Sequence, residues 1–258
     1  MNTKRSPLRE KPLRVPGQSL DEAIQRLRED ALLNYLFYAA AFVAFAFAEW
    51  VRWLTSAPYQ PVLITVAALI VLAYCTFRVR QIFQTIRFLK QGRDGERIVA
   101  EILDDLRRRG YATLHDIVAG DFNIDHVVIS PHGIYAVETK TLSKPPQGEI
   151  SFQGNDLIAG NNYLGNEPIR QAEAEAKWLQ ALLMESTGKK LPVKPVLVFP
   201  GWYVQPMPQA IKNEVWVLNP KALVAFMENE PSTLSASDMH MAAFHLARYV
   251  RAFDPKPA

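Results

Sequence analysis

Two carboxylates and a lysine near the middle of the chain have the types and the spacing that metal-ion chemistry requires. Asp125 stands before a pair of short apolar runs, at residues 127–129 and 134–137, and Glu138 and Lys140 follow them. Carboxylate oxygens are the preferred ligands of hard divalent ions such as Mg²⁺ and Mn²⁺. A lysine beside such an ion can orient a water molecule and help to deprotonate it. The pattern therefore indicates metal-assisted chemistry on a water molecule, if the fold brings the three side chains together.

A β-hairpin is the element that has to position these side chains. The two apolar runs flank a turn signal, SPHG, at residues 130–133. If the two middle residues form the loop, Asp125 lies directly opposite Glu138, roughly 5 Å away between Cβ atoms. Two carboxylates at that distance repel each other, which favours a cation between them.

The same turn also allows a different register. Pro131 cannot adopt the positive φ of a type I′ turn, and Gly133 suits a type I turn with a bulge. A bulge would slip the pairing by one residue, so that Asp125 would face Thr139 instead of Glu138. On spacing alone, surface charges on an edge hairpin are an alternative interpretation.

Length and composition limit the class of protein. The 258 residues give room for one ordinary soluble domain plus further segments. Cys75 is the only cysteine, which excludes an intramolecular disulfide and argues against a cysteine-based zinc site. The five histidines show no metal-ligand spacing, and a formal net charge of +3 is too small to indicate nucleic acid as a partner.

Two uncharged apolar runs, at residues 31–48 and 61–77, precede the soluble part of the chain. Eighteen helical residues rise about 27 Å, close to the hydrocarbon thickness of a bilayer. The connection between the runs contains Trp50, Trp53 and Tyr59, aromatic residues that are typical of a membrane interface. The pattern predicts two transmembrane helices joined as a hairpin.

Positive charge lies outside this hairpin, whereas the connection between the runs carries only Arg52. The flanking basic residues are Lys4, Arg5, Arg9, Lys11, Arg14, Arg78, Arg80, Arg87 and Lys90. Both ends of the chain are therefore expected in the cytoplasm. The alternative is a signal peptide, because residues 46–48 (AFA) resemble a cleavage site; the acidic Glu29 and Asp30 before the first run argue against it.

The composition changes along the chain define five expected segments. They are a basic cytoplasmic N-terminal segment at 1–30, transmembrane helices within 31–77, a basic helical connector at 78–91, an α/β domain at 92–230, and a C-terminal helix and tail at 231–258. The prolines of the first part predict disorder there, followed by a short helix from Ser19 or Asp21. Helices are expected at 96–109, 168–186, 221–228 and 235–253, and strands at 111–118, 127–129, 134–137, 148–152, 156–159, 193–199 and 215–218.

With these pieces in order, the soluble part resembles the nuclease-related domain (NERD) family, which is grouped with the PD-(D/E)XK nuclease-like proteins. Four blocks carry the resemblance over about residues 92–203: GRDGE at 92–96, NIDHVV at 123–128, GIYAVETK at 133–140 and NEPIRQ at 166–171. The order and spacing of all four blocks make the likeness far more specific than Glu-x-Lys alone.

The resemblance implies an α/β fold with a restriction-endonuclease-like mixed sheet flanked by helices. It also implies one site formed by Glu96, Asp125, Glu138, Lys140 and Gln171, in which Mg²⁺ or Mn²⁺ is bound by Asp125, Glu138, the backbone carbonyl of Thr139 and Glu96. The expected function is a membrane-anchored nuclease of the PD-(D/E)XK type that acts on the cytoplasmic side. Its expected partners are the lipid bilayer and nucleic acid, with DNA indicated by family analogy and contacted through its backbone.

Several of these residues also have ordinary structural interpretations. Glu96 in the first turn of a helix complements the helix dipole wherever it occurs, and Gln171 one turn into a helix is compatible with a plain surface position. His126 and His132 are expected to be structural. The arginines at 107–109 are typical of a solvated helix end and contact phosphate only if they face the cleft. Trp178, Leu179 and Leu182 are expected in the core. The alternative function is a non-catalytic, membrane-tethered scaffold or nucleic-acid-binding protein, or a sensor or assembly module.

Overall fold

A computed structural model describes residues 12–55, 60–145, 148–208, 211 and 214–252. The disorder expected for residues 1–11 and the loop position of Tyr59 lie outside the described residues. The chain divides into two compact units. One is Leu20–Gln91, and the other combines the described part of Met1–Ser19 with Gly92–Ala258.

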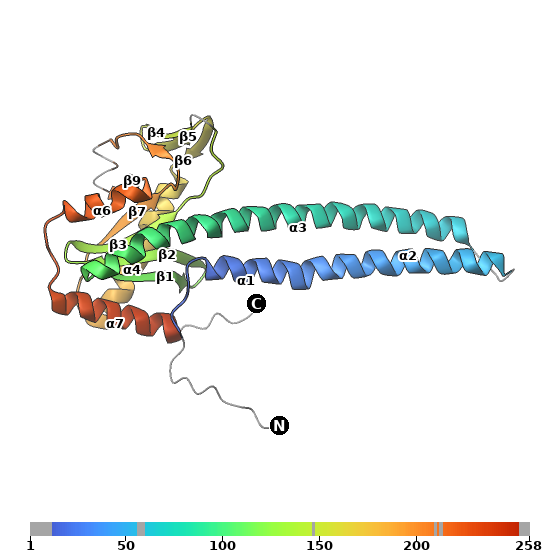
Figure 1. The fold of residues 1–258 in the computed structure, drawn as a ribbon, viewed down its shortest axis with the longest axis horizontal. Helices are drawn as coiled ribbons and strands as arrows, with labels where there is room; N and C mark the ends of the chain where they lie inside the picture. The colour runs from blue at the N-terminus through green and yellow to red at the C-terminus, as the bar shows by residue number, and fades with distance from the viewer. Residues whose placement is uncertain (1–11, 56–59, 146–147, 209–210, 212–213, 253–258) are drawn as a thin grey trace, which may run out of the picture. The chain divides into compact units, whose positions relative to one another are not determined.

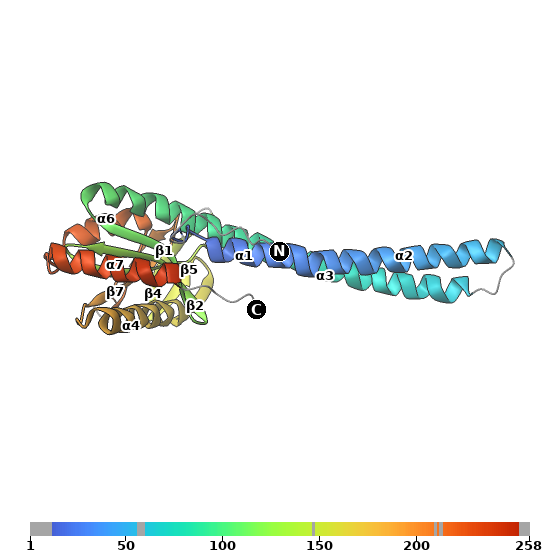
Figure 2. The same ribbon diagram turned by 90° about the horizontal axis from the view of Figure 1, so that it is seen from below.

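The unit Leu20–Gln91 is helical. Helix α1 (Gln18–Arg26) continues through a π-helical stretch (Leu27–Leu32) into α2 (Leu33–Leu54), and α3 (Pro61–Asp104) follows. Within this unit, α2 and the first part of α3 run side by side (Figures 1 and 2). The sequences expected as a transmembrane helix and a connector, residues 61–77 and 78–91, thus form one uninterrupted helix.

Contacts along the length of this unit hold α2 against α3. The rings of Tyr35 and Tyr74 meet edge to face at 6.2 Å, and the guanidinium of Arg78 lies 5.4 Å from the centroid of Tyr35. Near the other end, the indole Nε1 of Trp50 donates a hydrogen bond to the hydroxyl of Thr65 at 3.0 Å. The two helices therefore pair antiparallel over most of α2.

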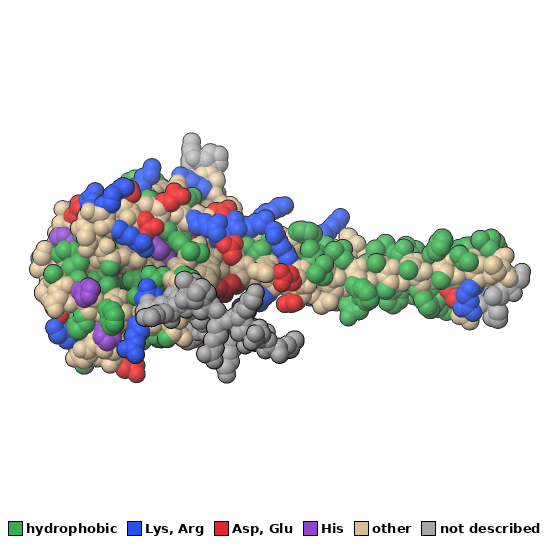
Figure 3. Space-filling model, turned by 60° about the horizontal axis from the view of Figure 1, so that its bottom comes forward, with side chains coloured by type: hydrophobic (Ala, Val, Ile, Leu, Met, Phe, Trp, Pro, Cys, Tyr) green, Lys and Arg blue, Asp and Glu red, His purple; other side chains and the backbone are tan. Residues whose placement is uncertain are grey.

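The outer surface of the helix pair is apolar (Figure 3). Large side chains such as Phe37 (70% exposed) and Val62 (69%) face outwards. The two charged residues of the stretch 31–77, Glu49 and Arg52, neutralise each other through a 2.6 Å ion pair near the turn. A soluble protein rarely exposes so large an apolar area. Both helices are long and apolar enough to cross a membrane.

A five-stranded mixed sheet forms the centre of the second unit, with strand order β1-β2-β3-β7-β9. The strands are β1 (Ala112–Ala119), β2 (Phe122–Ser130), β3 (Gly133–Thr139), β7 (Val193–Val198) and β9 (Trp216–Leu218). The pairs β1–β2 and β2–β3 are antiparallel, whereas β3–β7 and β7–β9 are parallel. The predicted α/β fold with a mixed sheet is confirmed.

A four-stranded second sheet has the order β6-β5-β4-β8. It consists of β4 (Glu149–Gln153), β5 (Asp156–Ala159), β6 (Asn162–Gly165) and the two-residue strand β8 (Tyr203–Val204). The hairpin β4–β5 was expected, but β6 and β8 were not. Both are too short to show a clear alternation of apolar and polar residues.

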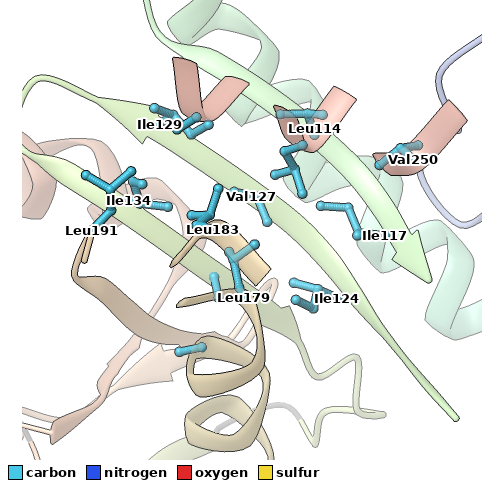
Figure 4. Packing of buried hydrophobic residues seen from close by; sticks show 14 residues of the cluster. Leu114, Ile117, Ile124, Val127, Ile129, Ile134, Leu179, Leu183, Leu191 and Val250 are labelled. Atoms are coloured by element: carbon cyan, nitrogen blue, oxygen red, sulfur yellow. The ribbon is translucent and has the colours of Figure 1, made fainter. Parts of the chain in front are cut away.

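Helices cover both faces of the central sheet. On one face, α4 (Glu167–Thr187) and α7 (Ala236–Ala252) contribute to a core with β1, β2 and β3; Figure 4 shows Leu179 and Leu183 of α4 pointing towards Val127 of β2. On the other face, the end of α3, the 3₁₀-helix Asp105–Arg109 and α6 (Pro220–Glu228) pack against β3, β7 and β9. The expected core position of Leu179 is confirmed, and Trp178 and Leu182 are partly buried and pack against this core.

The β2–β3 hairpin has the tight register. Ser130 pairs with Gly133 and His126 pairs with Val137, so Pro131 and His132 form a two-residue loop. Neither loop residue has a positive φ; among the described non-glycine residues, only Asp116 does. The bulged alternative, in which Asp125 would face Thr139, is therefore not the one adopted.

Candidate active site

The end of the β2–β3 hairpin holds Asp125 next to the Glu-Thr-Lys sequence of β3. The backbone N–H of Thr139 donates a 2.7 Å hydrogen bond to Oδ2 of Asp125. This bond fixes the first carboxylate beside the strand that carries the second, Glu138. The side chain of Glu138 is 6% exposed and Asp125 is half-buried, so neither acid stands on a solvated edge. The buried acids and the groups around them are called the acidic pocket below.

Helix α4 supplies Gln171, which links the acid and the lysine of this strand. Nζ of Lys140 lies 2.7 Å from Oε1 of Glu138 and donates a second hydrogen bond, also 2.7 Å, to Oε1 of Gln171. The amide nitrogen of Gln171 donates in turn to Oε1 of Glu138 at 2.9 Å. The three side chains form a closed triangle that fixes the position of the ammonium group.

Glu175, one helical turn beyond Gln171, is a site residue that the sequence analysis missed. Residues four positions apart lie on the same face of a helix. The amide of Gln171 donates to Oε1 of Glu175 at 2.9 Å. The residue is 1% exposed, and Oε2 of this carboxyl has no hydrogen-bond partner among the described residues. A spacing of four from Gln171 was the signal that could have identified it.

Helix α3 brings Glu96 to the same pocket because Gly95 lets it approach the end of β3. A Cβ atom on Gly95 would lie 1.7 Å from the hydroxyl oxygen and 2.8 Å from Cβ of Thr141. Only glycine therefore permits this contact, which explains the Gly-Glu pair of the first block. Glu96 itself is 7% exposed and lies close enough to Glu138 for their charges to interact.

The pocket concentrates negative charge in a place with little water. Burial, with the charges of Asp116 and Glu138, raises the pKa of Glu96 to about 8. Burial, with the charge of Glu138, raises the pKa of Glu175 to about 9. The pKa of Asp125 is likewise raised, because burial and the charges of Glu138 and Glu96 oppose its ionisation. Raised pKa values of several acids that face one another are a feature of functional sites.

The donor set fits a hard divalent cation. Carboxylate oxygens and one buried, unpartnered carboxyl oxygen are what Mg²⁺ and Mn²⁺ bind, and a cation would relieve the repulsion that raises these pKa values. Among the described residues, however, no three His, Cys, Asp or Glu side chains already stand in an arrangement that could hold a metal ion. Binding would therefore require the carboxylates to turn towards one point.

The remaining residues singled out in the sequence have structural contacts. His132 Nδ1 lies 2.6 Å from the carbonyl oxygen of Glu230, and the Nδ1 atoms of His126 and His115 are 2.9 Å apart. Arg107 donates to the hydroxyl and the carbonyl of Thr113 at 2.5 and 3.0 Å. Arg108 pairs with Asp105, and Arg109 pairs with Glu228. The hydroxyl of Thr139 is buried without a partner among the described residues.

Comparison with known proteins identifies the kind of domain that carries these residues. Residues 91–200 match the family model of the nuclease-related domain, NERD. No curated protein and no solved structure matches the chain. The matched region includes all five residues predicted from the sequence, namely Glu96, Asp125, Glu138, Lys140 and Gln171, together with Glu175. The chain therefore carries a nuclease-related domain of the NERD family, which suggests a nuclease-related function.

Proposed function

We propose that this protein is a membrane-anchored, metal-dependent nuclease that hydrolyses phosphodiester bonds, with DNA as its substrate, on the cytoplasmic side. One observation carries the proposal. Four acids, Glu96, Asp125, Glu138 and Glu175, are close enough for their charges to interact, and Lys140 forms an ion pair with one of them, Glu138. Burying so many carboxyl groups together is costly unless a cation joins them.

Asp125, Glu138 and the backbone carbonyl of Thr139 would hold Mg²⁺ or Mn²⁺, with Glu96 binding through a water molecule or a second ion. The bound ion would acidify a water molecule and neutralise charge on the scissile phosphate. Hydrolysis joins the water oxygen to phosphorus and breaks one P–O ester bond, which leaves a phosphate monoester and a hydroxyl group. Every other contribution comes from the side chains of the pocket.

Lys140 has the role of orienting the attacking water and stabilising charge on the phosphate. Its ammonium group is held by Glu138 and Gln171, so its N–H bonds are directed before substrate arrives. Gln171 can hold it only with its amide oxygen towards Lys140, and the amide nitrogen bonds to Glu138 and Glu175 enforce that orientation. Glu175 thus acts on Lys140 through Gln171.

Two features support anchoring by a transmembrane hairpin. The helices α2 and α3 pair through their lengths and expose apolar side chains. In addition, Arg14 before the first apolar run and Asp116 of the nuclease-related domain form a 2.6 Å ion pair. Residues in contact lie on the same side of a membrane, which requires an even number of crossings between them. The same contact needs the N-terminal segment to be retained, which argues against removal of a signal peptide.

The excess of basic residues on the flanks assigns this common side to the cytoplasm. Cysteines introduced at the exposed positions 55 and 252, in the cysteine-free background Cys75→Ala, test the assignment in intact cells. We expect an impermeant thiol reagent applied from outside to label position 55 and to spare position 252. Labelling of position 252 alone would show the opposite orientation.

The nuclease activity is tested with the full chain in detergent. Single- and double-stranded DNA and RNA are incubated with Mg²⁺, Mn²⁺ or EDTA. We expect metal-dependent cleavage of DNA that is absent with EDTA. A protein that binds Mn²⁺ and DNA but cuts none of the four substrates would instead be a membrane-tethered scaffold.

A further inference from the structure

The segment at residues 14–19, which precedes the first long helices in the chain, reaches the acidic pocket. Arg14 Nε lies 2.6 Å from Oδ2 of Asp116, and the backbone N–H of Ser19 donates to the same oxygen at 3.0 Å. Arg14 also donates to the hydroxyl of Ser19 at 2.9 Å. The Arg14 side chain is 10% exposed and that of Asp116 is 3% exposed. A charge pair this well buried is costly to break.

A tight turn shapes the segment between these contacts. The N–H of Gln18 donates to the carbonyl of Val15 at 3.1 Å, with Pro16 and Gly17 as the central residues. Gly17 has a φ of +70°, and proline followed by glycine at these positions is typical of a type II turn. The N–H of Gly17 takes no part in the turn bond and donates instead to the carboxyl group of Glu96.

Two close approaches, at Gly17 and Gly95, bring other segments against α3 near Glu96. A Cβ atom on Gly17 would lie 2.7 Å from Cγ and 3.3 Å from Cα of Arg93, so the turn rests directly on the helix. Gly95 makes the corresponding close approach to Thr141. Glu96 follows Gly95 directly in α3 and is 7% exposed. Asp116 adds a negative charge beside it, which Arg14 balances.

We propose that residues 14–19 form one wall of the acidic pocket, and that Arg14 is a positioning residue that holds this wall so that Gly17 orients Glu96 for metal binding. The inference rests on the proposed function for the identity of the ligand, a divalent cation. Hydrogen-bond partners of ligating carboxylates affect metal affinity by about 10–100-fold when they are removed. A nuclease-related domain cut away from this segment would lack that partner.

Four variants of the full chain in detergent test the proposal. Arg14→Ala removes the ion pair, and Gly17→Ala displaces the turn while the pair remains possible. Arg14→Lys restores a positive charge but not the planar fork of the guanidinium. Arg26→Ala removes an exposed arginine of α1 and serves as the matched control.

Two Mn²⁺ concentrations are measured. The first gives half of the maximal increase in melting temperature, and the second gives half of the maximal cleavage rate. We expect both concentrations to rise about 10–100-fold in Arg14→Ala and Gly17→Ala, less in Arg14→Lys, and not at all in Arg26→Ala. Cleavage at saturating Mn²⁺ should stay near the wild-type rate, because the segment acts on metal binding. The melting temperature without metal shows how far each variant remains folded.

The outcomes separate this inference from the proposed function. Suppose that the wild-type protein binds Mn²⁺ but cuts nothing, while Arg14→Ala and Gly17→Ala weaken Mn²⁺ binding. The nuclease proposal then fails, and the proposed role of residues 14–19 in metal binding is supported. If both variants fold and bind Mn²⁺ as tightly as the wild type, that role is refuted even though the protein cuts DNA. Faster cleavage or tighter binding in both variants would make the segment an inhibitory cover and would also overturn the proposal.

Discussion

Two neighbouring residues of β2, Asp125 and His126, belong to two buried polar clusters of opposite kind. Asp125 joins the carboxylates on the side of α4, where like charges oppose one another and raise the pKa of Asp125. His126 stacks edge to face on His115 at 5.1 Å, and burial lowers the pKa of both rings. One strand thus carries an acidic pocket and a neutral pair on successive residues.

The two clusters differ in the charge that their contacts within the protein leave. With one set of protons, the imidazoles pair as neutral rings: His115 Nε2–H donates to Asp104 at 3.1 Å, and His126 Nδ1–H donates to Nδ1 of His115 at 2.9 Å. Nε2 of His126 is buried without a partner among the described residues, but it carries no charge in this arrangement. Among the carboxylates, Glu138 accepts hydrogen bonds from Lys140 and the amide of Gln171, and Asp125 accepts one from the backbone N–H of Thr139. Oε2 of Glu175 has no partner among the described residues. Several buried groups of like charge indicate a ligand, whereas a buried pair of neutral rings indicates structure.

The largest effect is expected at Glu138, which belongs only to the acidic pocket. Glu138→Ala removes a carboxylate and the group that holds Lys140. We expect it to abolish Mg²⁺-dependent cleavage and to weaken Mn²⁺ binding together. Glu185→Ala, at an exposed position of α4, is the matched control and should leave both unchanged. Full cleavage by Glu138→Ala would remove the pocket from the mechanism.

Lys140 separates catalysis from metal binding within the same pocket. Lys140→Ala leaves all four carboxyl groups in place, so Mn²⁺ binding should persist. Cleavage should fall by about 10²–10⁴-fold, the usual contribution of a group that assists proton transfer. Lys190→Ala, which removes an exposed lysine, controls for charge. Equal loss of metal binding and cleavage would assign Lys140 a purely structural task.

The acidic pocket also predicts a dependence of metal binding on pH. The pKa of Glu96 is about 8 and that of Glu175 about 9, against an ordinary value of 4.5. Without metal, the folded protein therefore holds more protons than the unfolded chain between about pH 4.5 and pH 9. The free energy of unfolding falls as the pH rises through this range. A cation needs the deprotonated carboxylates. The increase in melting temperature caused by Mn²⁺ should thus be small at about pH 5.5 and larger at about pH 8.

Glu175→Gln sharpens this prediction. The change keeps the size of the side chain and an oxygen for the amide of Gln171, but it removes one titrating group. We expect the pH dependence of the Mn²⁺ effect to become shallower, while Glu185→Gln leaves it as in the wild type. A Mn²⁺ effect that is independent of pH in the wild type would contradict the raised pKa values.

The neutral cluster should give the reverse pattern, a cost in stability without a cost in metal binding. His126→Phe keeps an aromatic ring but leaves Nδ1 of His115 without its partner. Such a loss costs about 1–3 kcal/mol in the free energy of unfolding. Chemical denaturation measures that change, and Mn²⁺ titration of the folded variant should match the wild type. Weaker Mn²⁺ binding by the folded variant would show that the histidine pair contributes to the metal site, which would contradict the distinction between the two clusters.

The parts of the molecule that depend on local pattern could be predicted from the sequence. The apolar runs and the SPHG turn predicted the hairpin, but they left two registers open, of which the structure adopts the tight one. The four blocks predicted five candidate site residues, because each block keeps its chemistry within a few positions; their roles stay a prediction. Helix α4, Glu167–Thr187, begins and ends within one residue of the predicted range 168–186, although Asn166 makes no capping hydrogen bond with its side chain.

Contacts between distant parts of the chain could not be predicted in the same way. Arg14 and Asp116 are 102 positions apart, and no periodicity relates them. The basic N-terminal segment was expected to be disordered, yet Arg14 and Ser19 anchor its last residues to the nuclease-related domain. Glu175 could have been found by its helical spacing from Gln171, but Asp116 gives no signal until the fold places it beside Glu96.

The smallest effect is expected at Arg107, whose contacts belong to the neutral side of the comparison. An arginine run at a helix end suggests a phosphate contact, which would lower the salt dependence of nucleic-acid binding by about one unit of slope when removed. In the structure, however, the guanidinium donates to Thr113 at 2.5 and 3.0 Å and lies 3.1 Å from the carboxylate of Asp104, which also contacts His115. Its donors are thus engaged next to the histidine pair rather than in the acidic pocket.

Arg107→Ala should therefore leave the slope of log K against log salt unchanged. The slope is measured by fluorescence anisotropy with labelled DNA. If the slope in Arg107→Ala is smaller by one unit, Arg107 contacts a phosphate of the bound DNA. The surface that binds nucleic acid then extends beyond the carboxylates to this side of the sheet.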